Sequence, residues 1–297
     1  MNPIAKIMAT LRFVANHPLN RDRKFRAVAE YGFIQVAARL VPGDVCVAFP
    51  NHTGLLVSPR MKGAAHFIAP RLNEFNDMAF VMHFLRPGEM FADVGANIGA
   101  FTVLAAGVAG ARAVCFEPSP ETFAMLSRNI GLNALQGRVR AVNAVVGRQP
   151  GNVQFSIGLG TENHVAGATE TASSQLTQMT TLDKELAETP AVLLKVDVEG
   201  FETEVFAGAV ETVKNQALQA IIIERSGAGN RYGYDEEKLH AQIRSQGFSP
   251  YFYQPFERRL LPIPENFNSN IVYIRDLKTA NERLRTAPAF ELGGKKF

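Results

Sequence analysis

Cysteine is scarce in this sequence. Only Cys46 and Cys115 occur among the 297 residues, and they lie far apart in the chain. This spacing excludes the disulfide framework of a small secreted domain, and it excludes a zinc site built from cysteine ligands. The composition therefore fits a reducing environment, and we expect a cytoplasmic protein.

An excess of charge is also missing. The formal net charge is +3, the pI is about 8.9, and acidic and basic residues are interspersed along the chain. The main basic cluster is RDRKFR at residues 21–26, which is too short to predict a nucleic-acid-binding surface. The charge therefore identifies no partner, and we expect none among nucleic acids.

Long apolar runs, internal repeats and metal-ligand spacings are absent as well. A transmembrane helix needs about 20 consecutive apolar residues, so no integral membrane segment is expected. His17, His52, His66, His83 and His240 show no metal-ligand spacing with one another. We therefore expect no metal site.

Apolar residues are abundant, at 46% of the chain, which is enough for a large core. Pro87 and Gly88 end a largely buried helix for which Asn73 is the expected cap. We therefore divide the chain near residue 88 into an N-terminal helical and β-hairpin extension at 1–88, a cofactor-binding domain at 89–276 with an insertion at 151–180, and a tail at 277–297.

The extension has three recognisable parts. Apolar residues at helical spacing predict an amphipathic helix over 4–15, and composition and period predict a second helix over 23–40. Two short strands around the turn PNHTG predict a hairpin over 45–59. We expect the first helix to dock on the rest of the chain; a membrane-surface contact or a homodimer contact is the alternative.

Strands and helices alternate after residue 89. The strand segments are continuous apolar runs, which is typical of strands covered by helices on both faces. Such a succession predicts an α/β fold, a Rossmann-like doubly wound sheet, mostly parallel, with an antiparallel edge hairpin from 250–255 and 270–276. The expected parallel strands are 90–95, 111–118, 139–147, 191–200 and 217–226, and the expected helices are 98–109, 120–132 and 200–214.

The stretch FADVGANIGAF at 91–101 marks the end of the first of these strands. Gly95 and Gly99 permit a tight turn, and ligands of such sheets bind beyond the carboxyl ends of the strands. The spacing is G-x-x-x-G rather than the dinucleotide pattern G-x-G-x-x-G, and Asp93 would repel a pyrophosphate. A cationic ligand such as S-adenosylmethionine fits better. The alternative is that Asp93 only caps the next helix.

Two further strand ends carry polar residues suited to a nucleoside. Glu117 follows the second strand, where an acid can accept both hydroxyls of a ribose, or can instead stabilise the start of the next helix. Asn143 follows the third strand and could bond an adenine amine, because an amide both donates and accepts.

The fourth strand ends in LLKVDVEGFETEVF. Asp197 and Glu199 follow it at the same edge of the sheet and are candidate bases, whereas we assign Glu202 and Glu204 to the negative start of a helix. Lys195 stands in an apolar strand and should pair with a carboxylate if buried. Glu224 is a candidate partner for it, or equally a substrate contact.

Together these stretches resemble the FkbM-type methyltransferases. The similarity extends over roughly residues 73–275 and is carried, in order, by LRPGEMFADVGANIGAFT, CFEPSPETFAML, NAVVG, TLDKEL, LLKVDVEGFETEVFAGA and AIIIER. The resemblance implies a class I methyltransferase fold that binds S-adenosyl-L-methionine and methylates a hydroxyl oxygen, often on a sugar, lipid-linked glycan or secondary metabolite. It implies cofactor contacts from Asp93, Gly95, Asn97, Gly99 and Glu117, and a site role for Asp197. We expect Ala96, Pro118 and Asn143 to contact the cofactor as well.

An alcohol is a weak nucleophile until a base removes its proton. Asp197 and Glu199 lead the candidates for that base, and His164, in the polar loop of the insertion, is the third. A magnesium site from Asp197, Glu199 and Glu224 is an alternative. Two other functions stay open: a nucleic-acid methyltransferase on the same fold, and a non-catalytic sensor of S-adenosylmethionine.

Overall fold

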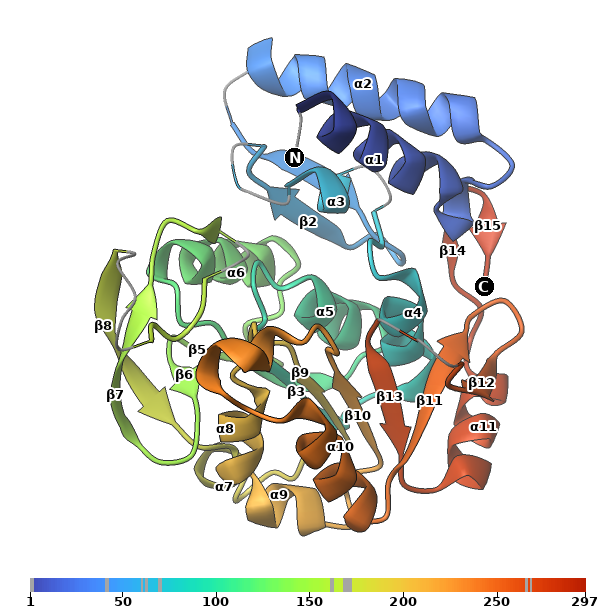
Figure 1. Ribbon diagram of the computed structural model, residues 1–297. Coiled ribbons are helices and arrows are strands. Elements are labelled where there is room, and N and C mark those ends of the chain that lie inside the picture. Colours follow the sequence, from blue (N-terminus) through green and yellow to red (C-terminus); the bar gives the residue numbers. More distant parts are fainter. Residues whose placement is uncertain are drawn as a thin grey trace.

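A sheet of eight strands forms the centre of the molecule (Figure 1). The structure is a computed structural model and describes residues 3–40, 43–59, 61, 64–68, 71–160, 163–167, 173–264, 267 and 269–297. The strands lie side by side in the order β12 (Arg259–Pro262), β11 (Ser249–Gln254), β13 (Ile271–Ile274), β10 (Ala220–Ile223), β9 (Leu193–Val196), β3 (Met90–Val94), β4 (Arg112–Phe116) and β5 (Val139–Val142).

Chain order runs outward from β3 in two directions. Strands β4 and β5 follow on one side and β9 and β10 on the other, and all of these pairs are parallel. The order therefore reverses between β3 and β9, which is where a doubly wound sheet binds its ligand. The predicted fold class, a mostly parallel doubly wound sheet with an antiparallel edge, is confirmed.

The antiparallel side is larger than predicted. Strands β11 and β13 pair as expected, and β13 joins the parallel part by pairing with β10. Strand β12 was not predicted; it forms a hairpin with β11 and takes the edge of the sheet.

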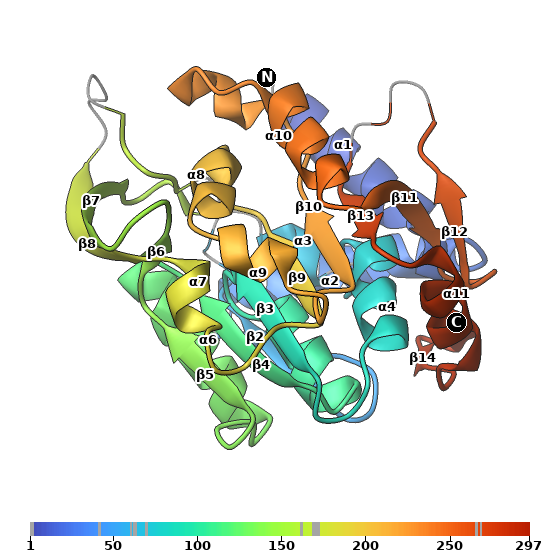
Figure 2. The same cartoon turned by 90° about the horizontal axis from the view of Figure 1, so that it is seen from below.

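Helices cover both faces of the sheet (Figures 1 and 2). Neighbouring residues of one strand point into different cores: Phe91 packs in one and Ala92 in the other. The first core includes α4 (Phe75–Phe84), α5 (Ala100–Val103), α6 (Pro120–Leu132) and α11 (Leu277–Thr286), and the second includes α7 (Leu182–Glu185), α8 (Glu202–Ala207), α9 (Val210–Lys214) and α10 (Glu236–Ser245). The continuous apolar strand runs are explained by this burial on both sides.

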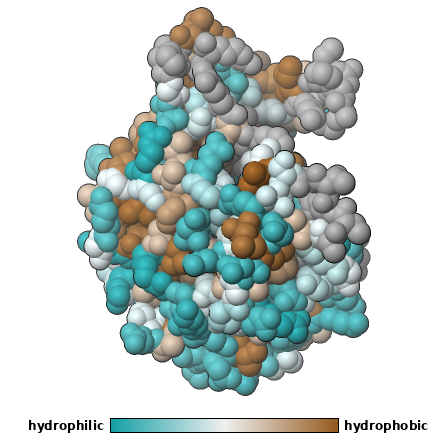
Figure 3. All heavy atoms as spheres, turned by 90° about the vertical axis from the view of Figure 1, so that its left-hand side faces the viewer, coloured by the Kyte–Doolittle hydropathy of each residue, from teal (hydrophilic) through white to brown (hydrophobic). Residues whose placement is uncertain are grey.

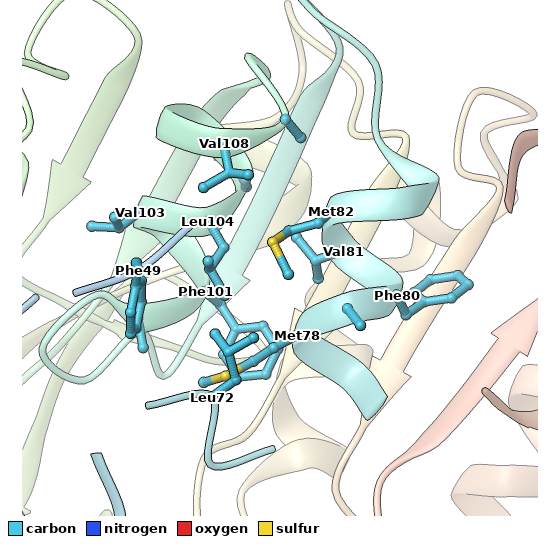
Figure 4. Close-up of a cluster of buried hydrophobic side chains, with 14 of the residues drawn as sticks. Phe49, Leu72, Met78, Phe80, Val81, Met82, Phe101, Val103, Leu104 and Val108 are labelled. Carbon is cyan, nitrogen blue, oxygen red and sulfur yellow. The ribbon is translucent and has the colours of Figure 1, made fainter. Parts of the chain in front are cut away.

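Helix α4 packs against α5 below the ligand-binding edge. Figure 4 shows Met78 and Met82 of α4 directed toward Phe101 and Leu104, and all four are buried. The predicted helix over 98–109 begins at residue 100 and becomes a π-helix over Leu104–Val108. The expected cap of α4 by Asn73 is wrong, because the cap position is Glu74 and its side chain makes no capping bond.

The N-terminal residues form a layer above α5 and α6 (Figure 1). Its elements are the expected helices and hairpin, together with short α3: α1 (Pro3–Asn16), α2 (Lys24–Leu40), β1 (Val45–Ala48), β2 (Gly54–Val57) and α3 (Ala64–Ile68). Asn129 of α6 and Asn133, the residue that caps the C-terminal end of α6, bond to the free edge of β2. Asn129 Oδ1 accepts from the backbone N–H of Leu56 at 2.6 Å, and Asn133 Oδ1 accepts from that of Gly54 at 2.9 Å.

The outer face of this layer is partly apolar. Phe25, Phe33 and Leu40 of α2 are exposed, and Figure 3 shows brown surface at the top of the molecule, where α1 and α2 lie. Among the residues that the structure describes, no helix has the length and apolar character needed to cross a membrane.

The insertion forms a small second sheet. Its order is β6 (Val145–Val146), β8 (Ser174–Thr180) and β7 (Gly151–Ser156), so the single strand predicted over 139–147 is two strands in two sheets. The helix predicted over 200–214 is likewise two helices, α8 and α9, on either side of Gly208. A Cβ at Gly208 would lie 2.0 Å from the carbonyl oxygen of Gly147, so the backbone passes too close for a side chain.

The C-terminal residues are more ordered than the predicted tail. They form α11 and a hairpin of β14 (Glu291–Leu292) and β15 (Lys295–Lys296). The Arg258 guanidinium donates to four backbone carbonyls of this segment, including that of Phe297 at 3.2 Å. Lys295 pairs with Asp22, so the hairpin also contacts the N-terminal layer.

Candidate functional site

Two loops meet backbone to backbone at the point where strand order reverses. Gly95 follows β3, Asp197 follows β9, and a Cβ on Gly95 would lie 1.8 Å from the carbonyl oxygen of Asp197. Gly95 also has φ of 79°, in the region that favours glycine. Both observations explain why glycine occupies this position in the turn.

A cavity of about 560 Å³ opens over these loops, a size suited to a small-molecule ligand. It lies at the carboxyl ends of β3, β4, β9 and β10. The insertion contributes Phe155, Asn163 and Val165 to its lining, and the approach to α4 contributes Asn73 and Glu74. The cavity is therefore built from the central sheet, the insertion and the part of the chain before residue 88.

Seven of the predicted cofactor-contact and base residues line this cavity directly. Three of them, Glu117, Asp197 and Glu199, supply carboxyl groups, and the others are Gly95, Ala96, Asn97 and Pro118. The cavity therefore brings together predicted residues from three strand ends. Between Gly95 and Glu199 these residues span 104 positions of the chain. Their roles toward a ligand stay predictions.

Glu117 is held firmly at the end of β4. Its Oε2 accepts from the backbone N–H of Asn97 at 3.0 Å, and its Oε1 accepts from that of Ser119 at 2.9 Å. Burial raises the pKa of Glu117 to about 7, while these two backbone bonds act in the opposite direction. Asn97 adopts φ of 52°, and its own side chain accepts from the N–H of Ile98, so the glycine loop and Glu117 fix each other.

Asp93 lies beneath the cavity rather than in its lining. The residue is fully buried, its Oδ2 accepts from the Thr102 hydroxyl at 2.7 Å, and its Oδ1 has no hydrogen-bond partner. Burial raises the pKa of Asp93, and the nearby charge of Lys195 lowers it. This placement does not support the direct ligand contact expected for Asp93.

Three other predicted residues also lie outside the lining. Gly99 begins α5 with φ of 91°, and a Cβ there would meet Leu126 at 2.6 Å. The Asn143 amide donates to the carbonyls of Glu117, at 2.8 Å, and Pro118, at 3.1 Å, and so supports the loop after β4. His164 is buried, and its backbone pairs with Ser156 while its chain neighbours face the cavity.

Lys195 supplies a buried positive charge on the cavity floor. It is 2% exposed, its Nζ lies 2.8 Å from Asp197 Oδ2, and it lies 4.7 Å from the ring centre of Phe101. Burial acts to lower the pKa of Lys195, but three acids, Asp197, Asp93 and Glu74, raise it overall, so the ammonium stays charged. The predicted pairing of Lys195 with a carboxylate is confirmed, with Asp197 rather than Glu224 as the partner.

Glu74 lines the cavity from before residue 88, Asp77 lies beside it, and sequence reasoning missed both. The Asn270 amide donates to Glu74 Oε2 at 2.7 Å and to Asp77 Oδ2 at 3.2 Å. Burial raises the pKa of both acids, that of Asp77 to about 8. The only signal in the sequence was the pair of acids three positions apart in NEFND, at a helix start where acids are ordinary.

Glu224 lies at the far end of the cavity, directly after β10. Its Oε2 is buried without a hydrogen-bond partner. Burial, followed by repulsion from Asp197, Glu199 and Glu202, raises the pKa of Glu224 to about 8. A carboxyl group of this kind binds and releases a proton close to neutral pH.

The loop after β9 is supported from below. Glu199 adopts φ of 55°, and Gly200, with φ of 101°, leaves no room for a Cβ against Ala228. Glu202 Oε1 accepts from the backbone N–H groups of Val198 and Gly200, so this acid braces the loop. Within the described residues, Asp197, Glu199 and Glu224 included, no group of three histidine, cysteine, aspartate or glutamate side chains is arranged to hold a metal ion.

The strand order and the cavity at its reversal define a doubly wound α/β protein with a site for a small molecule. Comparison with known proteins gives the family. The methyltransferase FkbM domain family matches residues 93–250, which is more than half of the chain. The chain therefore belongs to the FkbM methyltransferase family.

Individual relatives match over shorter stretches or with lower identity. The 31-O-demethyl-FK506 methyltransferase FkbM of Streptomyces tacrolimicus is 35% identical over 99 residues, which span 32% of this chain and 37% of that protein. An rRNA methylase from Streptococcus thermophilus has a TM-score of 0.39 at 12% identity, covering 66% of this chain and 91% of its own. A putative transferase from Pyrococcus horikoshii has a TM-score of 0.41 at 14% identity, covering 82% and 81%.

Proposed function

We propose that the chain is a methyltransferase that binds S-adenosyl-L-methionine in the cavity at the reversal of strand order and methylates a hydroxyl oxygen of a small-molecule or glycan acceptor. When bound, this cofactor supplies an electrophilic methyl group on a positively charged sulfur. The residues that line the cavity fit this cofactor in their charge, in their polarity and in the position of Glu117.

Acidic groups outnumber basic ones in the described lining. Lys195 and Arg225 face five carboxyl groups, those of Glu74, Glu117, Asp197, Glu199 and Glu224. Such a balance attracts a ligand with a cationic end and repels the pyrophosphate of a dinucleotide. The charge thus supports the methyl donor over a nicotinamide or flavin dinucleotide.

Glu117 is the observation that carries the proposal. Each of its oxygens accepts one backbone N–H, which fixes the carboxyl group while leaving lone pairs for two ribose hydroxyls. Phe116, Val145 and Val146 line the cavity beside it and offer an apolar surface for a purine. These residues come from β4 and β6, so the nucleoside would occupy that side of the cavity.

The proposal is tested by calorimetric titration with S-adenosylhomocysteine. We expect Glu117→Ala to weaken binding about tenfold or more, because two hydrogen bonds to a charged group are lost. Glu121→Ala is the matched control, since Glu121 is exposed on the next helix and does not line the cavity. Equal affinities of the wild type and the Glu117 variant would remove this residue from the site.

Two observations support methyl transfer to an oxygen atom. One is the name of a relative, and the other is the group of acids next to the part of the cavity proposed for the nucleoside. The Streptomyces tacrolimicus relative is a 31-O-demethyl-FK506 methyltransferase, a name that describes methylation of an oxygen. In this chain Asp197, Glu199 and Glu224 provide carboxyl groups that can orient a hydroxyl and take its proton. The presence of these groups favours an enzyme over a sensor that only binds the cofactor.

No specific observation favours a nucleic-acid acceptor. Within the basic cluster at 21–26, Arg23 and Arg26 both pair with Glu30. Asp22 pairs with Lys295, so the segment is occupied by contacts within the chain. The cluster also lies in the N-terminal layer and contributes no residue to the cavity lining.

A further inference from the structure

Hydrogen bonds at the carboxyl edge of the sheet place the site residues in a row. The backbone N–H of Gly95 donates to Phe116, that of Asp197 donates to Val94, and that of Glu224 donates to Val196. Along the edge the order is therefore Glu117, Gly95, Asp197 and Glu224. A nucleoside held at Glu117 occupies one end of this row, and the Glu224 end remains for the acceptor.

Glu224 differs from the other acids in what its oxygens contact. Asp197 Oδ2 already accepts from the Lys195 ammonium at 2.8 Å, and Glu117 accepts from two backbone N–H groups. Glu224 Oε2 is buried, faces the cavity side of β10 and has no hydrogen-bond partner. A buried acceptor without a donor is unfavourable, and a hydroxyl group from a ligand would satisfy it.

The charges around Glu224 are also distinctive. Asp197 and Glu199 face it from the loop after β9, Glu202 faces it from α8, and all three disfavour its ionised form. Ser226, on its own loop, favours the ionised form through a hydrogen bond. The neighbouring cation Arg225 is engaged by Glu237 at 2.5 Å. These surroundings disfavour the ionised form of Glu224, and another positive charge that enters the cavity would favour it.

We propose that the Glu224 end of the cavity is the acceptor site and that Glu224 is the catalytic base, which the cationic cofactor converts to its ionised form on binding. This inference rests on the proposed function. In the reaction the acceptor oxygen bonds to the methyl carbon, the carbon–sulfur bond breaks with its electron pair left on sulfur, and the hydroxyl proton passes to Glu224. The Lys195–Asp197 pair then positions the neighbouring loop and does not take the proton.

The experiment counts protons when ligands bind, so it needs no identified acceptor. Titrations of the full chain with S-adenosylmethionine and with S-adenosylhomocysteine are run at pH 8 in two buffers of different ionisation enthalpy. Because the pKa of Glu224 lies at about 8, the sulfonium compound should release about half a proton more than the neutral thioether. The difference between the ligands cancels contributions from Glu117, which both ligands contact alike.

The variant Glu224→Gln should abolish this difference while both ligands still bind. Glu257→Gln is the control, because Glu257 is exposed and lies outside the cavity lining, and it should keep the difference. Equal proton release by both ligands in the wild type overturns the inference, and so does a difference that survives in Glu224→Gln. If neither ligand binds the wild type, the proposed function itself fails, and the two failures are thus distinguishable.

Discussion

At the scale of single residues, several acids in and beside the site are buried, and burial raises their pKa. Burial raises the pKa of Asp77 and Glu224 to about 8 and that of Glu117 to about 7, while Lys195 remains the charged partner of Asp197. Near neutral pH the folded state therefore holds protons that the same groups have already released in the unfolded chain.

Asp77 makes this protonation measurable as stability. Its pKa rises from an ordinary value of 3.8 to about 8, so the folded state binds more protons than the unfolded state between these pH values. The stabilisation is complete below about pH 4 and is lost as the pH rises through 8. Asp77→Asn removes the titrating group. As the pH rises, the free energy of unfolding of this variant should fall less than that of the wild type, by on the order of 2–5 kcal/mol.

The measurement is urea unfolding of both proteins from pH 5 to pH 9. A pH dependence in the variant that equals the wild-type dependence would show that Asp77 is ionised in the folded protein. Asp235→Asn serves as the comparison, because Asp235 is an exposed cap of α10 and asparagine also caps a helix, so this variant should unfold much like the wild type.

At the scale of elements, the sequence predicted what local pattern controls. The parallel strands lie where the apolar runs indicate, and α6 spans the predicted residues 120–132, because such patterns are local. The predicted element boundaries are wrong where contacts between residues distant in the sequence determine the structure. The helix over 200–214 breaks where Gly208 meets Gly147, and the strand over 139–147 splits because its second half pairs with β8.

The contact between the loops after β3 and β9 gives the second prediction. Gly95→Ala would place a methyl group 1.8 Å from the Asp197 carbonyl, at a φ that disfavours alanine, so the two loops must separate. We expect a loss of at least about 2 kcal/mol in the free energy of unfolding and loss of S-adenosylhomocysteine binding.

Gly137→Ala is the matched control for this variant. A Cβ at Gly137 meets nothing within 4 Å, so stability and binding should stay close to those of the wild type. Thermal unfolding and calorimetry measure both variants. Wild-type binding by Gly95→Ala would mean that the ligand does not depend on this loop junction.

At the scale of the whole molecule, the site depends on segments that sequence motifs do not join. The motifs near Gly95, Glu117 and Asp197 identified one side of the cavity, because each sits at a strand end. Glu74 and Asn270 form the other side of the cavity. They lie 196 positions apart in the chain, and no local sequence pattern predicts that they are in contact. The domain limits, a homodimer and a cytoplasmic location stay predictions.

Attachment of the N-terminal layer can be tested at Asn129. This residue is fully buried, and its amide bonds to both backbone groups of Leu56 and to the carbonyl of Ile98. Asn129→Leu leaves these groups unpaired and should reduce the free energy of unfolding by about 3 kcal/mol. Hydrogen exchange should then quicken in β1 and β2 before it quickens in β3 and β4.

Asn152→Leu, at an exposed position on β7, is the control and should leave the exchange pattern unchanged. Uniform acceleration across the sheet in Asn129→Leu would indicate instead that the N-terminal layer and the sheet unfold as one unit.

The central claim is that the cavity at the reversal of strand order holds a nucleoside with a cationic methyl-donating end. A crystal structure of the chain with S-adenosylhomocysteine tests it most directly. The account predicts both ribose hydroxyls about 3 Å from the Glu117 carboxyl oxygens and the purine against Val145 and Val146. A phosphate-bearing nucleotide at that carboxyl group, or a ligand bound elsewhere on the molecule, would contradict the account.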